Sequence, residues 1–338
     1  MFSFASSINL PLFWGFLIAT TVFLYVFLDG FDLGIGILFP FAPGEDARTR
    51  MANSIAPFWD ANETWLVLGG GGLFAAFPLA YSIILPALYI PVTLMLLSLI
   101  FRGVAFEFRF KAEGPSRKIW DYAFHSGSLG AAFMQGIILG GFVQGITVKN
   151  GVFAGDPFDW LTAFSLMTGL GVVSGYVLLG ATWLVWKTDG STQVWARRYA
   201  RYIGLFVLVF IGLVSLWVPF LHSQIGTRWF GTDFWWLLPL PVTTLIFFGL
   251  LYRSLSGKKD WLPFVCSFVL FLLAYLGLGI SLWPWAVPFS VTLAEAAAAP
   301  ESLSLLLVGA GIMLPVVVAY TIYCHFIFRG KTSIEPLY

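Results

Sequence analysis

The sequence predicts an all-α protein that crosses a membrane several times. Of its 338 residues, 59% are hydrophobic and only 10% are charged, and the mean hydropathy is +0.87. A soluble domain carries about 25% charged residues. The apolar residues form long runs, several of them near the roughly 20 residues that a helix needs to cross the hydrocarbon core. No basic segment or cleavage site precedes the first run, so we expect it to be retained as a span.

Hydropathy and charge divide the chain into about nine spans, which we expect to form one transmembrane domain over residues 1–338. The stretch from Thr64 to Phe101 carries no charge and is nearly two hydrocarbon thicknesses long at about 1.5 Å per residue. We therefore divide it between two spans that meet at Phe77 and Pro78. The expected spans are 11–40, 53–77, 79–106, 119–147, 160–186, 200–222, 234–252, 261–283 and 303–328.

Positive charge falls almost entirely on one side of these spans. Of the 18 Lys and Arg residues, all except Lys149 and Arg228 follow odd-numbered spans. Because Lys and Arg are retained in cytoplasmic loops, this distribution predicts an odd number of spans, with the N-terminus outside and the C-terminus in the cytoplasm. We expect the basic loops to contact membrane lipid headgroups. The net charge of +1 indicates no nucleic-acid partner.

Four carboxylates interrupt the apolar runs in two pairs of equal spacing. Asp29 and Asp32 lie in LDGFDLGIGIL, and Asp60 and Glu63 lie in IAPFWDANETW. An ionisable group at membrane depth is costly and is usually paired or functional. Residues three apart share a helix face, so we expect each pair to point into a bundle or a water-lined crevice. Both pairs should lie at similar depth on the cytoplasmic side.

These acids allow two interpretations. Each carboxylate could accept hydrogen bonds and only hold helices together, or it could relay protons. Asn62 and Trp65 are placed to tune the second pair. Glu107, at the inner end of the third span, could form an ion pair with Lys111 or mark the mouth of a proton path.

The chain shows no redox centre of its own. A haem needs an axial His, Met or Cys, but His125, His222 and His325 share no span, and we expect each to form hydrogen bonds at an interface. Gln135 and Gln144 should bond between helices or contact a ligand. We expect no catalytic residue and no metal site. The residues alone leave a proton-coupled transporter, a proton channel, or a proton-handling subunit of a larger complex.

Longer motifs around the acids resemble a known family. LDGFDLGIGIL and NSIAPFWDANETWLVLGGGGLFAAFPLAY resemble the N-terminal signature of subunit II of cytochrome bd-type ubiquinol oxidases. SLIFRGVAFEFR, GSLGAAFMQGIILGGFVQG and AYTIYCHFIFRGK agree with it. The resemblance covers essentially the whole chain and is strongest over the first 110 residues. The chain length and FMQGIILGGFVQGI resemble the cyanide-insensitive branch.

The resemblance implies a complex in the bacterial cytoplasmic (inner) membrane that oxidises ubiquinol and reduces O2 to water. A larger subunit I would carry two haems b, a haem d or b at the third position, and the quinol-oxidising loop. A small single-span accessory subunit and a structural ubiquinone are further expectations. Subunit II would fold as two four-helix bundles plus one peripheral helix. It would support assembly and haem retention and supply protons.

The resemblance also implies roles for individual residues. Asp29 and Asp60 match acids of a cytoplasmic proton route at the subunit interface, and Asp32 completes the DGFD motif. Protons would enter near Glu107 or the loop at 45–50, pass Asp60 and Asp29, and cross to subunit I.

Two further positions vary within the family. Glu63 stands where some members carry Gln, and Trp65 falls at a position associated with an apolar oxygen route in some members. The main alternative to the oxidase is a stand-alone proton-coupled transporter, which predicts broken helices, with Pro86 and Pro91 as candidate breaks, although no repeated halves are visible. A third interpretation is a purely structural assembly subunit, with the acids as contacts between helices.

Overall fold

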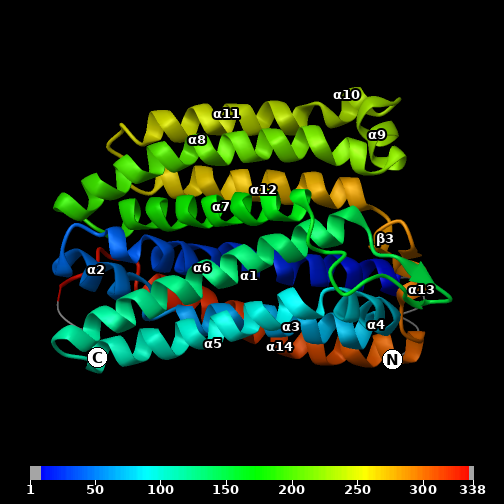
Figure 1. The fold of residues 1–338 in the computed structure, drawn as a ribbon, viewed down its shortest axis with the longest axis horizontal. Coiled ribbons are helices and arrows are strands. Elements are labelled where there is room, and N and C mark those ends of the chain that lie inside the picture. Colours follow the sequence, from blue (N-terminus) through cyan, green and yellow to red (C-terminus); the bar gives the residue numbers. More distant parts are fainter. Residues whose placement is uncertain (1–8, 335–338) are drawn as a thin grey trace.

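The computed structural model describes residues 9–334, and nearly all of them are helical (Figure 1). Long helices lie roughly parallel, and the short strands gather at one end of the molecule. Among these described residues, eight helices are long and apolar enough to cross a membrane. The predicted fold class, an all-α polytopic membrane protein, is therefore confirmed. Of the single domain predicted over 1–338, residues 1–8 and 335–338 lie outside the described part.

Helix α1 is the central helix of the first four-helix bundle. Its members are α1 (Leu10–Leu38), α3 (Trp59–Ala76), α5 (Tyr89–Lys111) and α6 (Pro115–Gln144). Helix α1 packs against α3 and α6, and α5 packs along α6. A 3-10 turn, η2 (Phe39–Phe41), ends α1 and leads to the short α2 (Glu45–Ile55). Helix α4 (Pro78–Ala87) follows α3 after a turn at Phe77.

The second bundle packs beside the first. It contains α7 (Ala163–Lys187), α8 (Gly190–Leu221), α11 (Pro239–Ser254) and α12 (Leu262–Leu282). Helix α7 joins the bundles, because it contacts α8 and α12 on one side and α1 and α6 on the other. Helix α14 (Pro300–Ile327) lies against α1 and α3 and is mostly exposed. The arrangement matches two four-helix bundles plus one peripheral helix.

The remaining short elements lie at the end of the bundles opposite α2 (Figure 1). They are α9 (Ser223–Phe230), α10 (Phe234–Leu237), α13 (Leu293–Ala296) and four strands, β1 (Val148–Lys149), β2 (Val152–Phe153), β3 (Trp285–Val287) and β4 (Val291–Thr292). The strands form two antiparallel hairpins, β1–β2 and β3–β4. Trp14 near the start of α1 donates to the carbonyl of Leu303 near the start of α14, so both helices begin at this end.

Two of the expected spans are interrupted. Residues 53–77 divide into the end of α2, a turn at Ala56–Phe58, and α3, which is only 18 residues long and holds two acids. It is not one of the eight long apolar helices. Residues 79–106 divide at Leu88 between α4 and α5. Pro86 and Pro91 flank this second break, and each removes a backbone N–H donor.

Glycine allows α1 and α7 to touch backbone to backbone. A Cβ at Gly34 would lie 1.8 Å from the carbonyl oxygen of Tyr176, and one at Gly180 would lie 2.6 Å from the carbonyl carbon of Gly34. Such close crossings are typical of membrane helices, where small residues let backbones approach. Gly34 follows Asp32 by two residues, so the contact that joins the bundles also holds the acidic segment of α1 in place.

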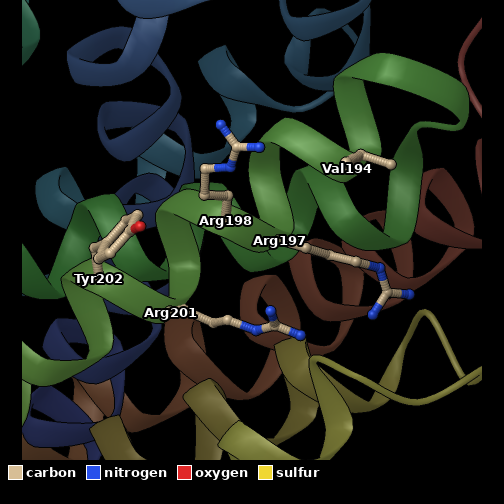
Figure 2. Close-up of a pocket in the computed structure, with 5 residues that line it drawn as sticks. All are labelled: Val194, Arg197, Arg198, Arg201 and Tyr202. Atoms are coloured by element: carbon tan, nitrogen blue, oxygen red, sulfur yellow. The ribbon is translucent and has the colours of Figure 1, made fainter.

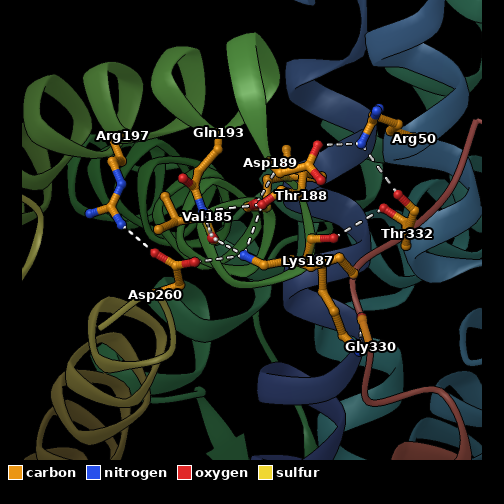
Figure 3. Close-up of polar contacts among 12 residues, drawn as sticks. Arg50, Val185, Lys187, Thr188, Asp189, Gln193, Arg197, Asp260, Gly330 and Thr332 are labelled. Atoms are coloured by element: carbon orange, nitrogen blue, oxygen red, sulfur yellow. Dashed lines mark hydrogen bonds and ion pairs between the residues drawn. The ribbon is translucent and has the colours of Figure 1, made fainter. Parts of the chain in front are cut away.

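Residues 328–333, the C-terminal strap, tie several elements together at the α2 end (Figure 3). Lys187 at the end of α7 donates to the carbonyl of Phe328, and Thr332 donates its backbone N–H to the carbonyl of Lys187 at 2.8 Å. Lys331 binds Asp260 at 2.8 Å, in the loop between α11 and α12. The strap therefore connects the peripheral helix to the second bundle.

Candidate proton-transfer site

A buried arginine organises the acids inside the first bundle. Arg102 of α5 is 1% exposed and donates to Asp29 Oδ1 of α1 at 2.5 Å. Its Nη2 atom lies 3.6 Å from Glu63 Oε1 of α3, an ion pair longer than a hydrogen bond. The Trp59 ring lies 5.7 Å from the guanidinium carbon. Helices α1, α3 and α5 therefore bring Asp29, Glu63 and Arg102 together.

Asp32 lies beside this group without a cation of its own. It is fully buried, and its Oδ2 accepts a hydrogen bond of 2.8 Å from Asn62, whose amide also donates to the carbonyl of Leu28. In residues 9–334, Asp32 Oδ1 and Asp29 Oδ2 accept no hydrogen bond. We call Asp29, Asp32, Glu63 and Arg102 the carboxylate cluster.

The carboxylate cluster contains more acidic groups than cations. Three carboxyl groups face one guanidinium, and unpaired charge is costly in a buried site. The carboxylate cluster therefore has acidic oxygens beyond those that Arg102 and Asn62 contact, and these oxygens accept no hydrogen bond within residues 9–334.

A chain of hydrogen bonds lies one turn from Asp29. Tyr176 of α7 donates to Gln135 Oε1 of α6 at 2.6 Å, and Gln135 Nε2 donates to the Tyr25 hydroxyl of α1 at 2.7 Å. The predicted bonding of Gln135 between helices is confirmed. For Gln144 the same prediction is wrong, because its amide donates to the carbonyl of Gly140 on its own helix.

Asp60 points away from the carboxylate cluster. Its side chain is exposed on the surface of α3, so the expectation that both members of each pair face inward is wrong for this residue. The reason is geometric, since positions three apart on a helix are rotated about 60° from each other. Helix α1 is central and buries both acids, whereas α3 lies at the bundle edge, where Glu63 turns inward and Asp60 does not.

Glu107 is also exposed, and within the described residues it forms no ion pair with Lys111. The fully buried cation at this helix end is Arg109, which was expected in the loop after the third span. Arg109 binds Asp121 at 2.6 Å and Glu45 at 2.7 Å. The seven-residue spacing of Arg102 and Arg109 was the available signal, because it places both on one face of α5.

Trp65 lies in the apolar core of the first bundle and is 3% exposed. Its indole N–H has no hydrogen-bond acceptor in the described part of the chain. This apolar placement is compatible with the oxygen route that the resemblance implies. Asn62, which was expected to act on the second acidic pair, instead donates a hydrogen bond to Asp32 of the first pair.

The three histidines lie in different parts of the described structure. His125 Nδ1 lies 2.9 Å from a carbonyl of α1, and His325 stacks on Phe58 with a ring-centre distance of 4.5 Å. His222 stacks on Phe289 at the opposite end of the molecule. Each histidine ring therefore contacts a different neighbour, and none of them contacts another histidine. Over residues 9–334, no group of three or more His, Cys, Asp or Glu residues could hold a metal ion.

The break between α4 and α5 borders an open groove of about 490 Å³. Its lining residues are uncharged: Leu85, Pro86, Tyr89, Ile90, Phe153 and Pro157. A proton-coupled transporter needs a substrate site near its coupling acids. The groove instead lies against β2, at the end opposite α2 (Figure 1). The helix break therefore occurs where the transporter alternative predicted it, but the groove lining offers no acid for coupling.

Comparisons with known proteins agree with the resemblance seen in the sequence. The family model for cytochrome bd terminal oxidase subunit II matches residues 10–328. The chain is 31% identical to cytochrome bd ubiquinol oxidase subunit 2 of Bacillus subtilis, over 95% of this chain and 96% of that protein. It is 28% identical to the cytochrome bd-I ubiquinol oxidase subunit 2 of Escherichia coli K12, over 96% and 95%.

A solved structure supports the fold. A chain of the bd oxidase from Geobacillus thermodenitrificans superposes with a TM-score of 0.76 and 20% identity, covering 95% of this chain and 99% of that one. The family model spans nearly all of the described residues. This chain therefore belongs to the cytochrome bd terminal oxidase subunit II family.

Proposed function

We propose that this chain is the non-haem subunit of a quinol:O2 oxidoreductase and that it delivers protons to its partner subunit through the carboxylate cluster and Asp60. Its family belongs to oxidoreductase complexes of the bacterial inner membrane and implies a partner subunit I, haem and quinol. In the proposal, subunit I carries haem b with haem d or b and oxidises ubiquinol. The present chain supports haem retention by covering part of that subunit.

The exposed carboxylate of Asp60 carries this proposal. An ionisable group that faced lipid at this depth would be costly, so the surface of α3 that presents Asp60 calls for a polar or charged neighbour. Glu63 lies one turn away and faces Arg102. Glu63 and Asp60 therefore connect the buried carboxylate cluster to the exposed surface of α3. In the proposal, subunit I is the neighbour that covers this surface.

Each step moves one proton between carboxyl oxygens. The cluster holds a proton shared among Asp29, Asp32 and Glu63. In contrast to the order that the resemblance implies, Glu63 passes it to the Asp60 carboxylate, and the exposed Asp60 passes it to an acceptor on subunit I. Arg102 remains protonated and stabilises the carboxylate that is left behind. Glu63 then regains a proton from the α2 end of the bundle, where Glu107 of α5 and the first turns of α2 (residues 45–50) lie.

The same proposal sets the orientation of the chain. Helices α1 and α14 begin at one end of the molecule, while α2 and the C-terminal strap lie at the other. The strap end carries nearly all Lys and Arg residues, which favours the cytoplasmic side. Proton entry from the cytoplasm and release of quinol protons outside would then generate a membrane potential without a pump.

The test is oxygen uptake by the purified complex with Asp60→Asn. We expect quinol-dependent O2 uptake to fall roughly tenfold or more, because a proton-transfer group is removed, with haem content unchanged. Asp60→Glu should restore most of the activity. Thr64→Val, one turn away on the same exposed side, and Glu113→Gln, a surface acid outside the route, are matched controls.

Full O2 uptake by an assembled Asp60→Asn complex would contradict the proton relay and favour the interpretation in which the acids only hold helices together. Loss of haem in that variant would favour the assembly role instead. Asp60→Glu then separates the two, because assembly depends on size and packing whereas relay depends on a titratable group.

A further inference from the structure

The first turns of α8 carry a basic groove that the proposed function does not use. Val194, Arg197, Arg198, Arg201 and Tyr202 line it, and its volume is about 400 Å³ (Figure 2). These positions recur at helical spacing, so all five lie along one side of α8. Figure 2 shows Arg201 directed toward the loop after α11 and Arg198 directed away from it, so their guanidinium groups flank the groove. We call this set the basic groove.

The length of α8 places the basic groove at the level of lipid headgroups. The helix has 32 residues, about 48 Å at helical rise, whereas the hydrocarbon core is about 30 Å thick. The stretch from Tyr202 to Leu221 is uncharged and has the length of one span. The arginines therefore lie just beyond the hydrocarbon, and Tyr202 occupies the interface, where tyrosine is enriched.

Within residues 9–334, two of the three arginine charges have no counterion. Arg197 binds Asp260 at 2.6 Å, and that carboxylate is shared with Lys331. Arg201 donates only to neutral acceptors, the Ser256 hydroxyl at 2.8 Å and a backbone carbonyl. Arg198 is exposed and forms no ion pair within residues 9–334. Two guanidinium forks are therefore available to bind an anion.

The surface next to the basic groove suits acyl chains. Leu205 and Phe206 follow on α8 and are 54% and 57% exposed. Helices α8 and α11 form the edge of the molecule far from α3, α5 and α14 (Figure 1). A ligand here would not compete with a partner subunit bound at Asp60.

We propose that the basic groove binds the phosphodiester headgroup of an anionic phospholipid from the adjoining leaflet. Arg198 and Arg201 bind the phosphate oxygens, and the acyl chains lie along Leu205 and Phe206. Charged guanidinium forks match phosphate geometry. A lipid fits better than a free anion because the uncompensated charges adjoin an exposed apolar surface at the membrane interface.

The experiment titrates the purified complex in mild detergent with dioctanoyl phosphatidylglycerol and follows its thermal unfolding. We expect the lipid to raise the unfolding midpoint. Replacing both Arg198 and Arg201 by Gln should weaken the apparent affinity roughly tenfold or more, given the contribution of each basic side chain near anionic lipid. Replacing both Lys258 and Lys259 by Gln is the matched control, because it removes the same charge from the neighbouring loop.

Other outcomes would overturn the proposal. If the two double variants weaken the affinity for the lipid equally, the lipid is attracted to positive charge in general and not to the basic groove. If the arginine variant keeps its affinity, the lipid binds elsewhere. Inorganic phosphate that matches the lipid would identify a free-anion site instead. The single variant Arg198→Gln guards against misfolding, since its exposed side chain makes no ion pair within residues 9–334. It should still weaken binding severalfold, and full affinity in that variant also contradicts the proposal.

Discussion

The side chain of Arg102 shows most clearly what a single residue contributes to this molecule. The acids of α1 and α3 could be found from the sequence, because carboxylates inside apolar runs stand out. The role of Arg102 could not, because it lies near a span end, where an arginine usually reaches the interface. Only the packing of α5 against α6, beside α1, turns it inward. The outward orientation of Asp60 was not predicted either, since the sequence does not tell which side of α3 is covered.

At this scale we predict that Arg102→Met prevents stable folding. It leaves Asp29 buried without its cation, which costs about 3–5 kcal/mol when one partner of a buried pair is removed. The yield of assembled complex and its unfolding midpoint should both fall strongly. Adding Asp29→Asn to Arg102→Met removes the orphaned charge and should recover most of the stability. If the double variant is as unstable as the single one, packing by Arg102 matters more than its charge.

The fold class was predicted correctly, but some helix boundaries and helix contacts were not. Most spans followed from hydropathy, but the breaks between α2 and α3 and between α4 and α5 were assigned to continuous helices. Helix α3 is short and polar at its start, so hydropathy averaged over a span hides its true beginning at Trp59. The contact between α1 and α7 could not be predicted either, because many glycines are present and the sequence does not say which two face each other.

The corresponding prediction concerns the glycine contact between the bundles. Gly180→Ala places a Cβ against the backbone of α1 and should cost about 1–3 kcal/mol, as overpacking does. Gly249→Ala is the control, because no atom lies within 4 Å of a Cβ at that position of α11. Its helix should be unchanged or slightly more stable. Thermal unfolding of the two complexes measures the difference, and equal midpoints would show that α1 and α7 can separate without loss.

In the whole molecule, the two bundles and the peripheral helix are held together at one end by the C-terminal strap. The family resemblance predicted the bundles, and the charge distribution predicted the side on which the strap lies. The contacts of Lys331 and Asp260 were not predictable, since they join residues 71 positions apart through a loop. Partial burial opposes ionisation of Asp260, but hydrogen bonds from Lys331 and Gln193 and the charges of Lys331 and Arg197 outweigh it and lower its pKa.

This pKa sets a pH dependence for the strap. A carboxyl group whose pKa is lower in the folded than in the unfolded state stabilises the fold above its unfolded pKa of about 4. That contribution is lost as the pH falls through the lower folded value. Protection of the amides of residues 328–333 against hydrogen exchange, measured relative to their intrinsic rates at each pH, should therefore be high at neutral pH and fall only below about pH 4. Asp260→Asn should make exchange fast at pH 7, whereas Asp233→Asn, an acid at the opposite end, should not. Slow exchange in Asp260→Asn would mean that Lys187, through the carbonyl of Phe328, holds the strap without this ion pair.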